Sequence, residues 1–398
     1  MIHLTKKVPL NATRNTGDLR HSRIRIWKGF VMTVEHALPF GRNMSKARAA
    51  VFALSAATFL SFAVAPTPVS AQLVTQSSPI FVEGSFEEIS TAGKVFTEGV
   101  VAAPDGRIFF TDMNTSAYTK DAKGLMGGRI FTFDPKSGQT ILFREPSLQA
   151  NGLHFDIDGD LIAAEGADYG GRRVSRTNLK TGDYRIIAAD YRGRPFNAPN
   201  DITSDRSGRI YFTDTRYVGH EPLEQSNGVY RIERDGRTVR LISDLNHPNG
   251  IDVSPDGKTL YVSIYSFGGF NIVEQSPDRF NRAPSGGIVA YDLSPDGDVS
   301  NPRTILDTNR EGGVDGMALD TEGNIYAGVG GSDKKQIVVY SPAGKQLATL
   351  SMPGKLSPTN LGFGRGADAQ TLYITVQGKG ALYRIRTTKT GYYVSSAK

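Results

Sequence analysis

Short runs of alternating hydrophobic and polar residues, each ending at a turn, recur along most of this chain. Aromatic and β-branched residues dominate the runs, and Asp, Gly and Pro separate them. Such runs are typical of β-strands, and the long apolar periodicity of an amphipathic helix does not appear. The pattern therefore predicts an all-β protein.

One unit of the pattern occurs six times: a polar residue, an entry strand, a D-x-x-G-like turn and a second strand. The copies lie 53, 49, 49, 66 and 45 residues apart and begin at Glu98, Asn151, Asn200, Asn249, Asp315 and Asn360. Two more strand-like runs separate most copies, so each period supplies four antiparallel strands. Four-stranded sheets repeated at this period are the blades of a β-propeller. We therefore expect a six-bladed β-propeller over residues 95–386.

The ends of the repeat region suggest how the ring closes. The sixth copy is one strand short, and residues 80–89 are apolar enough to supply the missing strand. The longest interval contains a Gly/Pro/Phe-rich stretch, residues 267–284, which we interpret as a loop over one face. A β-solenoid would have shorter repeats, and a sandwich would not explain six matching turns.

The first 71 residues differ in composition from the rest. They carry ten Lys/Arg and two Asp/Glu, a net charge of +8, which leaves −2 for residues 72–398. An apolar run, residues 49–65, follows Lys46 and Arg48 and leads to a small-residue site at Ala71. This predicts a leader over 1–71, with a signal peptide at 44–71 and an over-long start at 1–43. An uncleaved membrane anchor is the alternative, because a spanning helix needs only ~20 apolar residues.

Removal of the leader would give an exported protein, periplasmic or secreted, with an N-terminal segment (72–94), the propeller and a C-terminal tail (387–398). Its near-neutral body argues against a nucleic-acid partner. We expect no stable membrane association after leader removal, and a monomer, since closed rings have short sheet edges. The absence of cysteine excludes disulfides and thiolate chemistry.

The polar residue that opens each repeat is the main candidate for chemistry. A single Asn before Gly is more simply a turn residue, but six polar residues in one register converge on a propeller's axis. Two of them, Glu98 and Asp315, are acids that would repel each other, and a divalent cation would remove that cost. Oxygen ligands favour Ca²⁺, with Mg²⁺, Mn²⁺ and Zn²⁺ as alternatives.

Several motifs occur together in this order along the chain. They are F-x-E-G from Phe96, A-P-N-D from Ala198, Y-F-T-D from Tyr211, H-P-N-G from His247, S-P-D-G-K from Ser254 and V-D-G-M from Val314. In this order they resemble the SMP-30/gluconolactonase (regucalcin-like) family of calcium-dependent six-bladed propellers, and its exported bacterial gluconolactonases in particular.

The resemblance implies a calcium-dependent lactonase, which hydrolyses a sugar or related lactone to the hydroxy acid. It implies four metal ligands, Glu98, Asn200, Asn249 and Asp315. It also implies that Asp315 is the catalytic residue, either as general base or as nucleophile. The sequence does not separate these two roles.

Two departures from the family pattern concern the substrate. Ala198 stands where the animal branch has an arginine that holds sugar hydroxyls. Val100, Val101 and Ala102 stand where family members commonly have proline and an aromatic residue. We expect different substrate contacts and a more apolar mouth.

Further residues are candidates for substrate binding. Asn151 and Asn360 share the register of the expected ligands. His154 is a candidate proton shuttle or a structural histidine, and Tyr217 either flanks a sugar or packs at the rim. Asp201 would orient Asn200 or cap a turn.

Other enzyme classes lack their motifs in this sequence. The sequence contains no G-x-S-x-G motif of serine hydrolases, no H-E-x-x-H motif of zincins and no G-x-x-x-x-G-K motif of nucleotide-binding proteins. Membership of these three classes therefore has no support in the sequence. Two alternatives to a lactonase stay open. One is a non-catalytic ligand-binding propeller with a structural calcium, and the other is a phosphotriesterase-like hydrolase that uses the same site.

Overall fold

A computed structural model describes most of the chain after residue 72. The described residues are 73–74, 80–93, 96–113, 127–166, 170–217, 226–265, 286–308, 312–331, 333–354 and 356–394. The chain divides into two compact units, 1–63 and 64–398, and all described residues belong to the second. The predicted leader (1–71) and the predicted loop (267–284) lie outside the described residues. None of the described segments forms a helix long and apolar enough to cross a bilayer.

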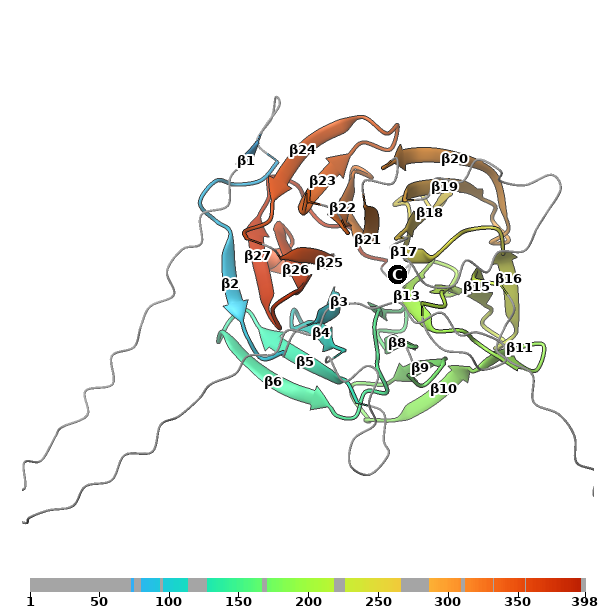
Figure 1. Ribbon diagram of the computed structural model, residues 1–398. Coiled ribbons are helices and arrows are strands. Elements are labelled where there is room, and N and C mark those ends of the chain that lie inside the picture. Colours follow the sequence, from blue (N-terminus) through green and yellow to red (C-terminus); the bar gives the residue numbers. More distant parts are fainter. Residues whose placement is uncertain are drawn as a thin grey trace, which may run out of the picture. The chain divides into compact units, whose positions relative to one another are not determined.

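Six antiparallel sheets surround a central axis within the described part of the chain (Figure 1). We number them as blades one to six in chain order. From the axis outward, blade one consists of β3 (Thr97–Ala102), β4 (Ile108–Asp112), β5 (Arg129–Asp134) and β6 (Gln139–Arg144). Blade two consists of β7 (Leu153–Phe155), β8 (Leu161–Glu165), β9 (Arg173–Thr177) and β10 (Tyr184–Ala188). Blade three consists of β13 (Pro199–Ser204), β14 (Ile210–Asp214), β15 (Gly228–Ile232) and β16 (Thr238–Ile242).

Blades four to six repeat this arrangement. Blade four consists of β17 (Pro248–Val253), β18 (Thr259–Ile264), β19 (Gly287–Leu293) and β20 (Val299–Asp307). Blade five consists of β21 (Gly313–Leu319), β22 (Ile325–Gly330), β23 (Gln336–Tyr340) and β24 (Gln346–Ser351). Blade six contains β25 (Ser357–Phe363), β26 (Thr371–Gln377) and β27 (Leu382–Arg386). A short hairpin, β11 (Asp190–Tyr191) and β12 (Arg194–Pro195), follows blade two, and a 3₁₀ turn, η2 (Gly366–Asp368), lies within blade six.

An N-terminal strand completes the ring. β2 (Glu87–Ser90) pairs with β27, so that Glu88 lies opposite Tyr383 and blade six gains its fourth strand. β1 (Leu73–Val74) pairs with β24 and adds a fifth strand to blade five. The predicted six-bladed propeller, closed by a strand from the N-terminal side, is confirmed.

The recurrent turn has a clear physical basis. In blade three, Asp205 Oδ1 accepts hydrogen bonds from the backbone N–H groups of Ser207 (2.8 Å) and Arg209 (3.1 Å). Gly208 lies at φ +78°, a conformation that favours glycine. The aspartate therefore satisfies the backbone donors of the turn and the glycine permits its shape, which explains why this turn marks each blade.

The hydrophobic core is divided around the ring. The innermost strands are almost wholly buried, whereas the outermost strands, such as β6 and β20, expose most of their residues. Among the described residues, one hydrophobic cluster lies between each pair of neighbouring blades. Each blade is thus stabilised by both neighbours, and the core is complete only when the ring is closed.

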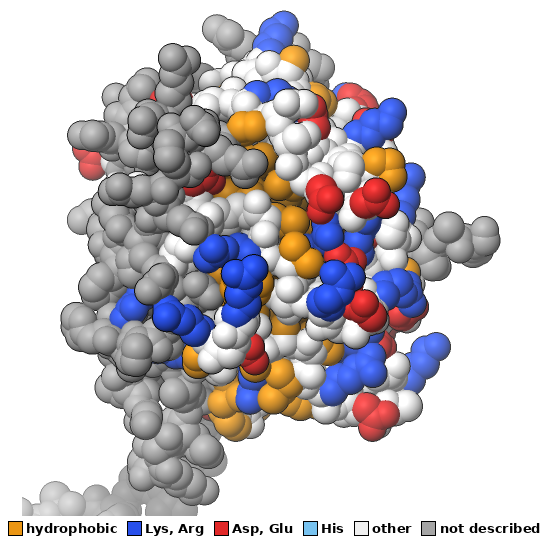
Figure 2. Space-filling view, turned by 90° about the vertical axis from the view of Figure 1, so that its right-hand side faces the viewer, with side chains coloured by type: hydrophobic (Ala, Val, Ile, Leu, Met, Phe, Trp, Pro, Cys, Tyr) orange, Lys and Arg blue, Asp and Glu red, His pale blue; other side chains and the backbone are white. Residues whose placement is uncertain are grey.

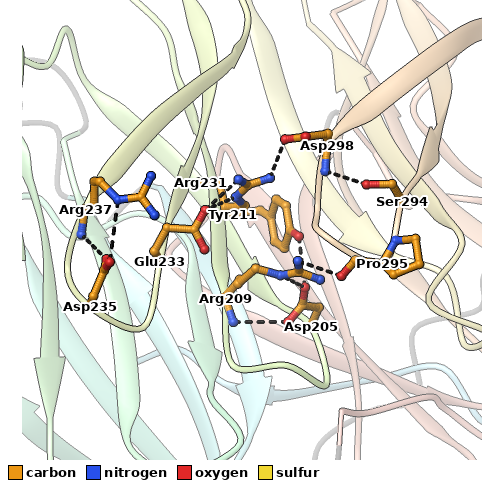
Figure 3. Close-up of polar contacts among 10 residues, drawn as sticks. All are labelled: Asp205, Arg209, Tyr211, Arg231, Glu233, Asp235, Arg237, Ser294, Pro295 and Asp298. Carbon is orange, nitrogen blue, oxygen red and sulfur yellow. Dashed lines mark hydrogen bonds and ion pairs between the residues drawn. The ribbon is translucent and has the colours of Figure 1, made fainter.

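Polar contacts also join the blades near the turns (Figure 3). Arg209 Nη1 on blade three donates to the carbonyl oxygen of Pro295 on blade four (2.9 Å). Arg231 donates to Asp298 (3.0 Å) across the same seam and to Glu233 (2.7 Å) within its own blade. These contacts fix blade three against blade four beside Tyr211, which belongs to the hydrophobic cluster between the same blades.

The outer wall of the ring carries charges of both signs. Figure 2 shows basic and acidic side chains side by side over the face that it draws. The described residues on that face form no extended surface of one charge that would attract a polyanion.

The segment predicted as a C-terminal tail is packed as far as residue 394. The N–H of Tyr392 donates to the carbonyl oxygen of Leu319 (2.9 Å). The guanidinium of Arg365 lies 4.0 Å from the centre of the Tyr393 ring, and the Tyr393 hydroxyl donates to the carbonyl oxygen of Phe363. Residues 392–394 and all six innermost strands line a cavity of about 50 Å³ on the axis. The C-terminal segment therefore closes one end of the central channel.

Candidate active site

The structure brings the opening residues of the repeats to the central channel. All six are buried, with 3–7% of their surface exposed. Five lie on the innermost strands, and Asn151 lies two residues before β7. They are Glu98, Asn151, Asn200, Asn249, Asp315 and Asn360.

A β-bulge marks this position on the innermost strands. In β17 the pairing register shifts between Pro248 and Ile251, and similar shifts occur in β3, β13, β21 and β25. Bulges redirect side chains and are common beside active sites. Asn249 and Gly250 therefore belong to a distorted strand, not to the turn that an isolated Asn-Gly pair would suggest.

The glycine after the polar residue permits neighbouring blades to approach closely. A Cβ atom at Gly250 would lie 2.7 Å from the carbonyl oxygen of Asp315, and one at Gly99 would collide with the carbonyl oxygen of Asn151. Side chains at these positions would force the innermost strands apart. In the four blades whose polar residue precedes glycine, the missing side chain thus permits this close approach.

Buried hydroxyl groups connect blades one, three and four to the site residue of the following blade. Thr111 donates to the backbone carbonyl oxygen of Asn151 (3.0 Å). In the same way, Thr213 donates to the carbonyl oxygen of Asn249 (2.6 Å) and Ser263 to that of Asp315 (2.6 Å). Sequence reasoning missed this role. Its signal is a hydroxyl residue at the same register in F-F-T-D, Y-F-T-D and L-Y-V-S.

The two acids of the site are held in an unfavourable environment. Burial, and then the charges of Asp315 and Asp201, raise the pKa of Glu98 well above its usual range. Burial and the charge of Asp201 do the same to the pKa of Asp315, against a hydrogen bond from Asn249. Asp315 Oδ1 is buried and has no hydrogen-bond partner among the described residues.

Asp201 forms the third acid of this group. Its Oδ1 accepts the N–H of Ile202 (2.9 Å), and Asn360 Nδ2 approaches its Oδ2 (3.4 Å). Burial raises the pKa of Asp201 to about 7. It is therefore a buried side chain that lines the channel, and it does not cap a turn.

Tyr217 lies beside the amide of Asn249. Its hydroxyl accepts a hydrogen bond from Asn249 Nδ2 (3.2 Å) and donates to the carbonyl oxygen of Tyr265 (3.1 Å). Its ring stacks on His247 with centroids 5.1 Å apart. Because the amide nitrogen of Asn249 donates to Tyr217 and to Asp315, its amide oxygen is the atom left to accept or to bind a cation.

His154 lies on β7 and lines the channel cavity. Its Nε2 is buried without a hydrogen-bond partner in the described part of the chain. Burial, and to a lesser degree the charge of Arg365, lower the pKa of His154 to about 3. The imidazole is therefore neutral at physiological pH, and its role as a proton shuttle stays a prediction.

The residues expected to form an apolar mouth are as buried as the site residues. Val100, Val101 and Ala102 are 5%, 3% and 0% exposed, and they pack into the clusters between blade one and its neighbours. Val100 and Val101 also line the axial cavity, and a more apolar mouth stays a prediction. Ala198 is also buried, at 5%.

The channel also contains an acid that gives a pH test of the fold. Burial raises the pKa of Asp252 to about 7, whereas an unfolded aspartate titrates near ~4. The stability contributed by protonated Asp252 is therefore full below pH ~4 and is lost as the pH rises to about 7.

We expect Asp252→Asn to raise the melting temperature of the metal-free protein at pH 8 more than at pH 5. Equal changes at the two pH values would contradict this.

Comparison with known proteins identifies the family. Residues 166–378, more than half of the chain, match the family model described as "SMP-30/Gluconolactonase/LRE-like region". The chain belongs to this family. The SMP-30 match includes Asn200, Asp201, Tyr217, Asn249, Asp315 and Asn360, and it begins after Glu98, Asn151 and His154.

Two curated relatives of this SMP-30 family chain are named as lactone hydrolases. The chain is 32% identical over 264 residues to a gluconolactonase of Zymomonas mobilis, covering 63% of this chain and 65% of that protein. It is 29% identical over 224 residues to a lactonohydrolase of Aspergillus oryzae, covering 54% and 49%. The chain thus spans half to two thirds of the length of these relatives.

Solved structures share the fold of this SMP-30 family chain. A gluconolactonase of Xanthomonas campestris has a TM-score of 0.59 at 22% identity, covering 82% of this chain and 99% of that one. A calcium-binding protein of Agrobacterium tumefaciens, named regucalcin, has a TM-score of 0.60 at 18% identity, covering 80% and 98%.

Proposed function

We propose that this protein is a metal-dependent lactonase that hydrolyses a sugar or related lactone to the hydroxy acid. The observation that carries the proposal is the buried pair Glu98 and Asp315, which converges with amide side chains at the propeller axis. Lactone hydrolysis is also the activity named for the curated relatives. The proposal includes an exported, monomeric protein.

The residues at the axis fit a hard divalent cation. They offer carboxylate and amide oxygens. Burial and neighbouring acids raise the pKa of both Glu98 and Asp315, and Asp315 Oδ1 lacks a partner among the described residues. No three His, Cys, Asp or Glu side chains of the described segments gather into a metal cluster. A cation at the axis would therefore need amide oxygens as well as carboxylates, and half of the proposed ligand set consists of amides. The proposed ligands are Glu98, Asn200, Asn249 and Asp315, and oxygen donors favour Ca²⁺ over Mg²⁺, Mn²⁺ or Zn²⁺.

In this mechanism a bound cation would polarise the lactone carbonyl and keep the acid pair ionised. Asp315 takes a proton from water as the water oxygen bonds to the carbonyl carbon, or its carboxylate attacks that carbon and water later releases the product. In either route the bond between the carbonyl carbon and the ring oxygen breaks. The ring oxygen then takes up a proton, which gives the hydroxy acid.

A panel of sugar and aliphatic lactones, assayed with residues 72–398 in Ca²⁺ and in chelator, tests this function. We expect calcium-dependent hydrolysis of at least one lactone. Phosphotriesters in the same panel test the alternative hydrolase, which a higher kcat/KM on phosphotriesters than on lactones would support. Binding of Ca²⁺ without turnover of any member would favour the non-catalytic propeller and would overturn the proposal.

A further inference from the structure

Tyr217 is anchored between blades three and four. It follows β14 of blade three, after two residues that are themselves fixed. The hydroxyl of Thr215 donates to the carbonyl oxygen of Pro248 on blade four, and the N–H of Arg216 donates to Asn227 Oδ1 (2.8 Å) on blade three. The backbone that carries Tyr217 is thus held by both blades.

The ring of Tyr217 stacks on His247, which directly precedes β17. The two rings are nearly parallel, with an angle of 6° between their planes and centroids 5.1 Å apart. His247 is buried and adopts φ +46°, a left-handed conformation that is uncommon outside glycine. Such a conformation persists only where the surroundings fix it, so the imidazole has a defined place against the Tyr217 ring.

A backbone carbonyl group sets the direction of the hydrogen bonds at Tyr217. The Tyr217 hydroxyl lies 3.1 Å from the carbonyl oxygen of Tyr265, which can only accept a hydrogen bond. The single hydroxyl proton of Tyr217 therefore points at Tyr265, and its oxygen accepts from Asn249, 3.2 Å away. The side chain of Asn249 must then present its Nδ2 to Tyr217.

The carbonyl group of Tyr265 is itself held in place. The N–H of Tyr265 donates to the carbonyl oxygen of His247 (3.2 Å). A Cβ atom at Gly313 of blade five would lie 2.6 Å from Tyr265 Cα, so the neighbouring blade packs directly against this backbone. The acceptor that orients the Tyr217 hydroxyl therefore has little room to turn away.

A cation site depends on which end of the Asn249 amide faces it. The amide carries one oxygen, which can bind a cation, and one nitrogen, which only donates hydrogen bonds. With Nδ2 held on Tyr217, the amide oxygen lies on the other side of the group, away from the tyrosine. The orientation is thus set before a cation arrives, so binding does not have to immobilise this side chain.

On the basis of the proposed function, we propose that Tyr217 is a positioning residue of the cation site, which holds the Asn249 amide with its oxygen turned toward the cation. His247 supports the Tyr217 ring, so the H-P-N-G motif supplies both a ligand and the support for its orientation. Tyr217 itself contacts neither the cation nor the lactone. It therefore acts on cation affinity, and not on kcat or KM once the cation is saturating.

Tyr217→Phe tests the proposal, because it removes the hydroxyl and keeps the ring that stacks on His247. Calorimetry with Ca²⁺ should show a dissociation constant roughly 3–10-fold higher than that of the wild type, as for the loss of one neutral hydrogen bond. In saturating Ca²⁺, kcat and KM on the best lactone should stay within about twofold of the wild type. Tyr211→Phe is the matched control, since it removes a buried hydroxyl that bonds to Asp205 (2.9 Å) and should leave the dissociation constant unchanged.

The same substitution in an Asn249→Asp background separates positioning from a merely structural role. Aspartate offers an oxygen to the cation whichever way its carboxylate turns, and it has no N–H to donate to Tyr217. Tyr217→Phe should therefore leave the dissociation constant of Asn249→Asp unchanged or lower it. A merely structural role would weaken Ca²⁺ binding equally in both backgrounds.

The possible outcomes separate this inference from the proposed function. An unchanged dissociation constant in Tyr217→Phe, or an equal rise in both backgrounds, overturns the role of Tyr217 and leaves the lactonase intact. A rise in KM at saturating Ca²⁺ overturns it as well, because Tyr217 would then contact the substrate. Should Tyr217→Phe fail to fold, 4-aminophenylalanine at 217 replaces it. Its amine still donates to Tyr265 but accepts poorly, so an unchanged dissociation constant would then overturn the proposal. A wild-type protein that binds no Ca²⁺ overturns both.

Discussion

Asp315→Asn is expected to lower kcat on the best lactone by about 10²–10⁴-fold, the range for loss of a general base. Asparagine has nearly the same shape but can neither take a proton from water nor attack a carbonyl carbon. It also removes one of the mutually repelling buried charges, so the metal-free variant should melt at or above the wild-type temperature. Initial rates in saturating Ca²⁺, with calorimetric unfolding, measure both effects.

Asp252→Asn is the matched control for this experiment. Asp252 is also an acid of the channel, but it lies outside the proposed ligand set and bonds to Thr203. Its variant should keep the wild-type kcat. If Asp315→Asn kept kcat within tenfold of the wild type, Asp315 would be neither base nor nucleophile.

Removal of the divalent cation is expected to abolish hydrolysis and to lower the melting temperature. Without the cation, burial and the charge of Asp201 raise the pKa of Asp315 and so disfavour the ionised form that acts as a base. A cation at 100 times its dissociation constant stabilises the fold by about 2.7 kcal/mol. At about 1.5 °C per kcal/mol for a protein of roughly 330 residues, this predicts a rise of roughly 4 °C on addition of Ca²⁺.

Glu98→Gln separates the cation site from general effects of salt. The variant loses one of the two charged ligands, so the same Ca²⁺ addition should produce a much smaller rise in melting temperature. A rise equal to that of the wild type would place the cation elsewhere. Titration of both proteins with Ca²⁺ at constant ionic strength gives the comparison.

The six-bladed ring could be predicted from the sequence because each blade repeats the same local chemistry. Residues such as Asp205 and Gly208 shape a turn through contacts within five positions, and such contacts leave a clear periodic signal. The burial of Tyr393 depends on residues far away in sequence, and the composition of 387–398 therefore suggested only a tail.

The site was accessible in part for the same reason. The register of Glu98 and Asp315 follows from the repeat, so their convergence could be predicted from geometry. Tyr265 belongs to no repeated position, and its ring lies against Gly313 of the next blade, a contact that the repeat does not encode. The family comparison at Val100 and Val101 concerned residue types alone, so it could not show that both side chains pack between blades and also line the axial cavity.

The packed C-terminal segment has a consequence for how the protein is made. β2, near the start of the ring, pairs with β27, and Tyr393 lines the axial cavity together with Val100 of blade one. Neither contact can form until the chain has been synthesised past these late residues, and contacts so distant in sequence form slowly. A nonsense mutation at codon 392 would therefore spare every proposed ligand and still remove the residues that close this end of the channel.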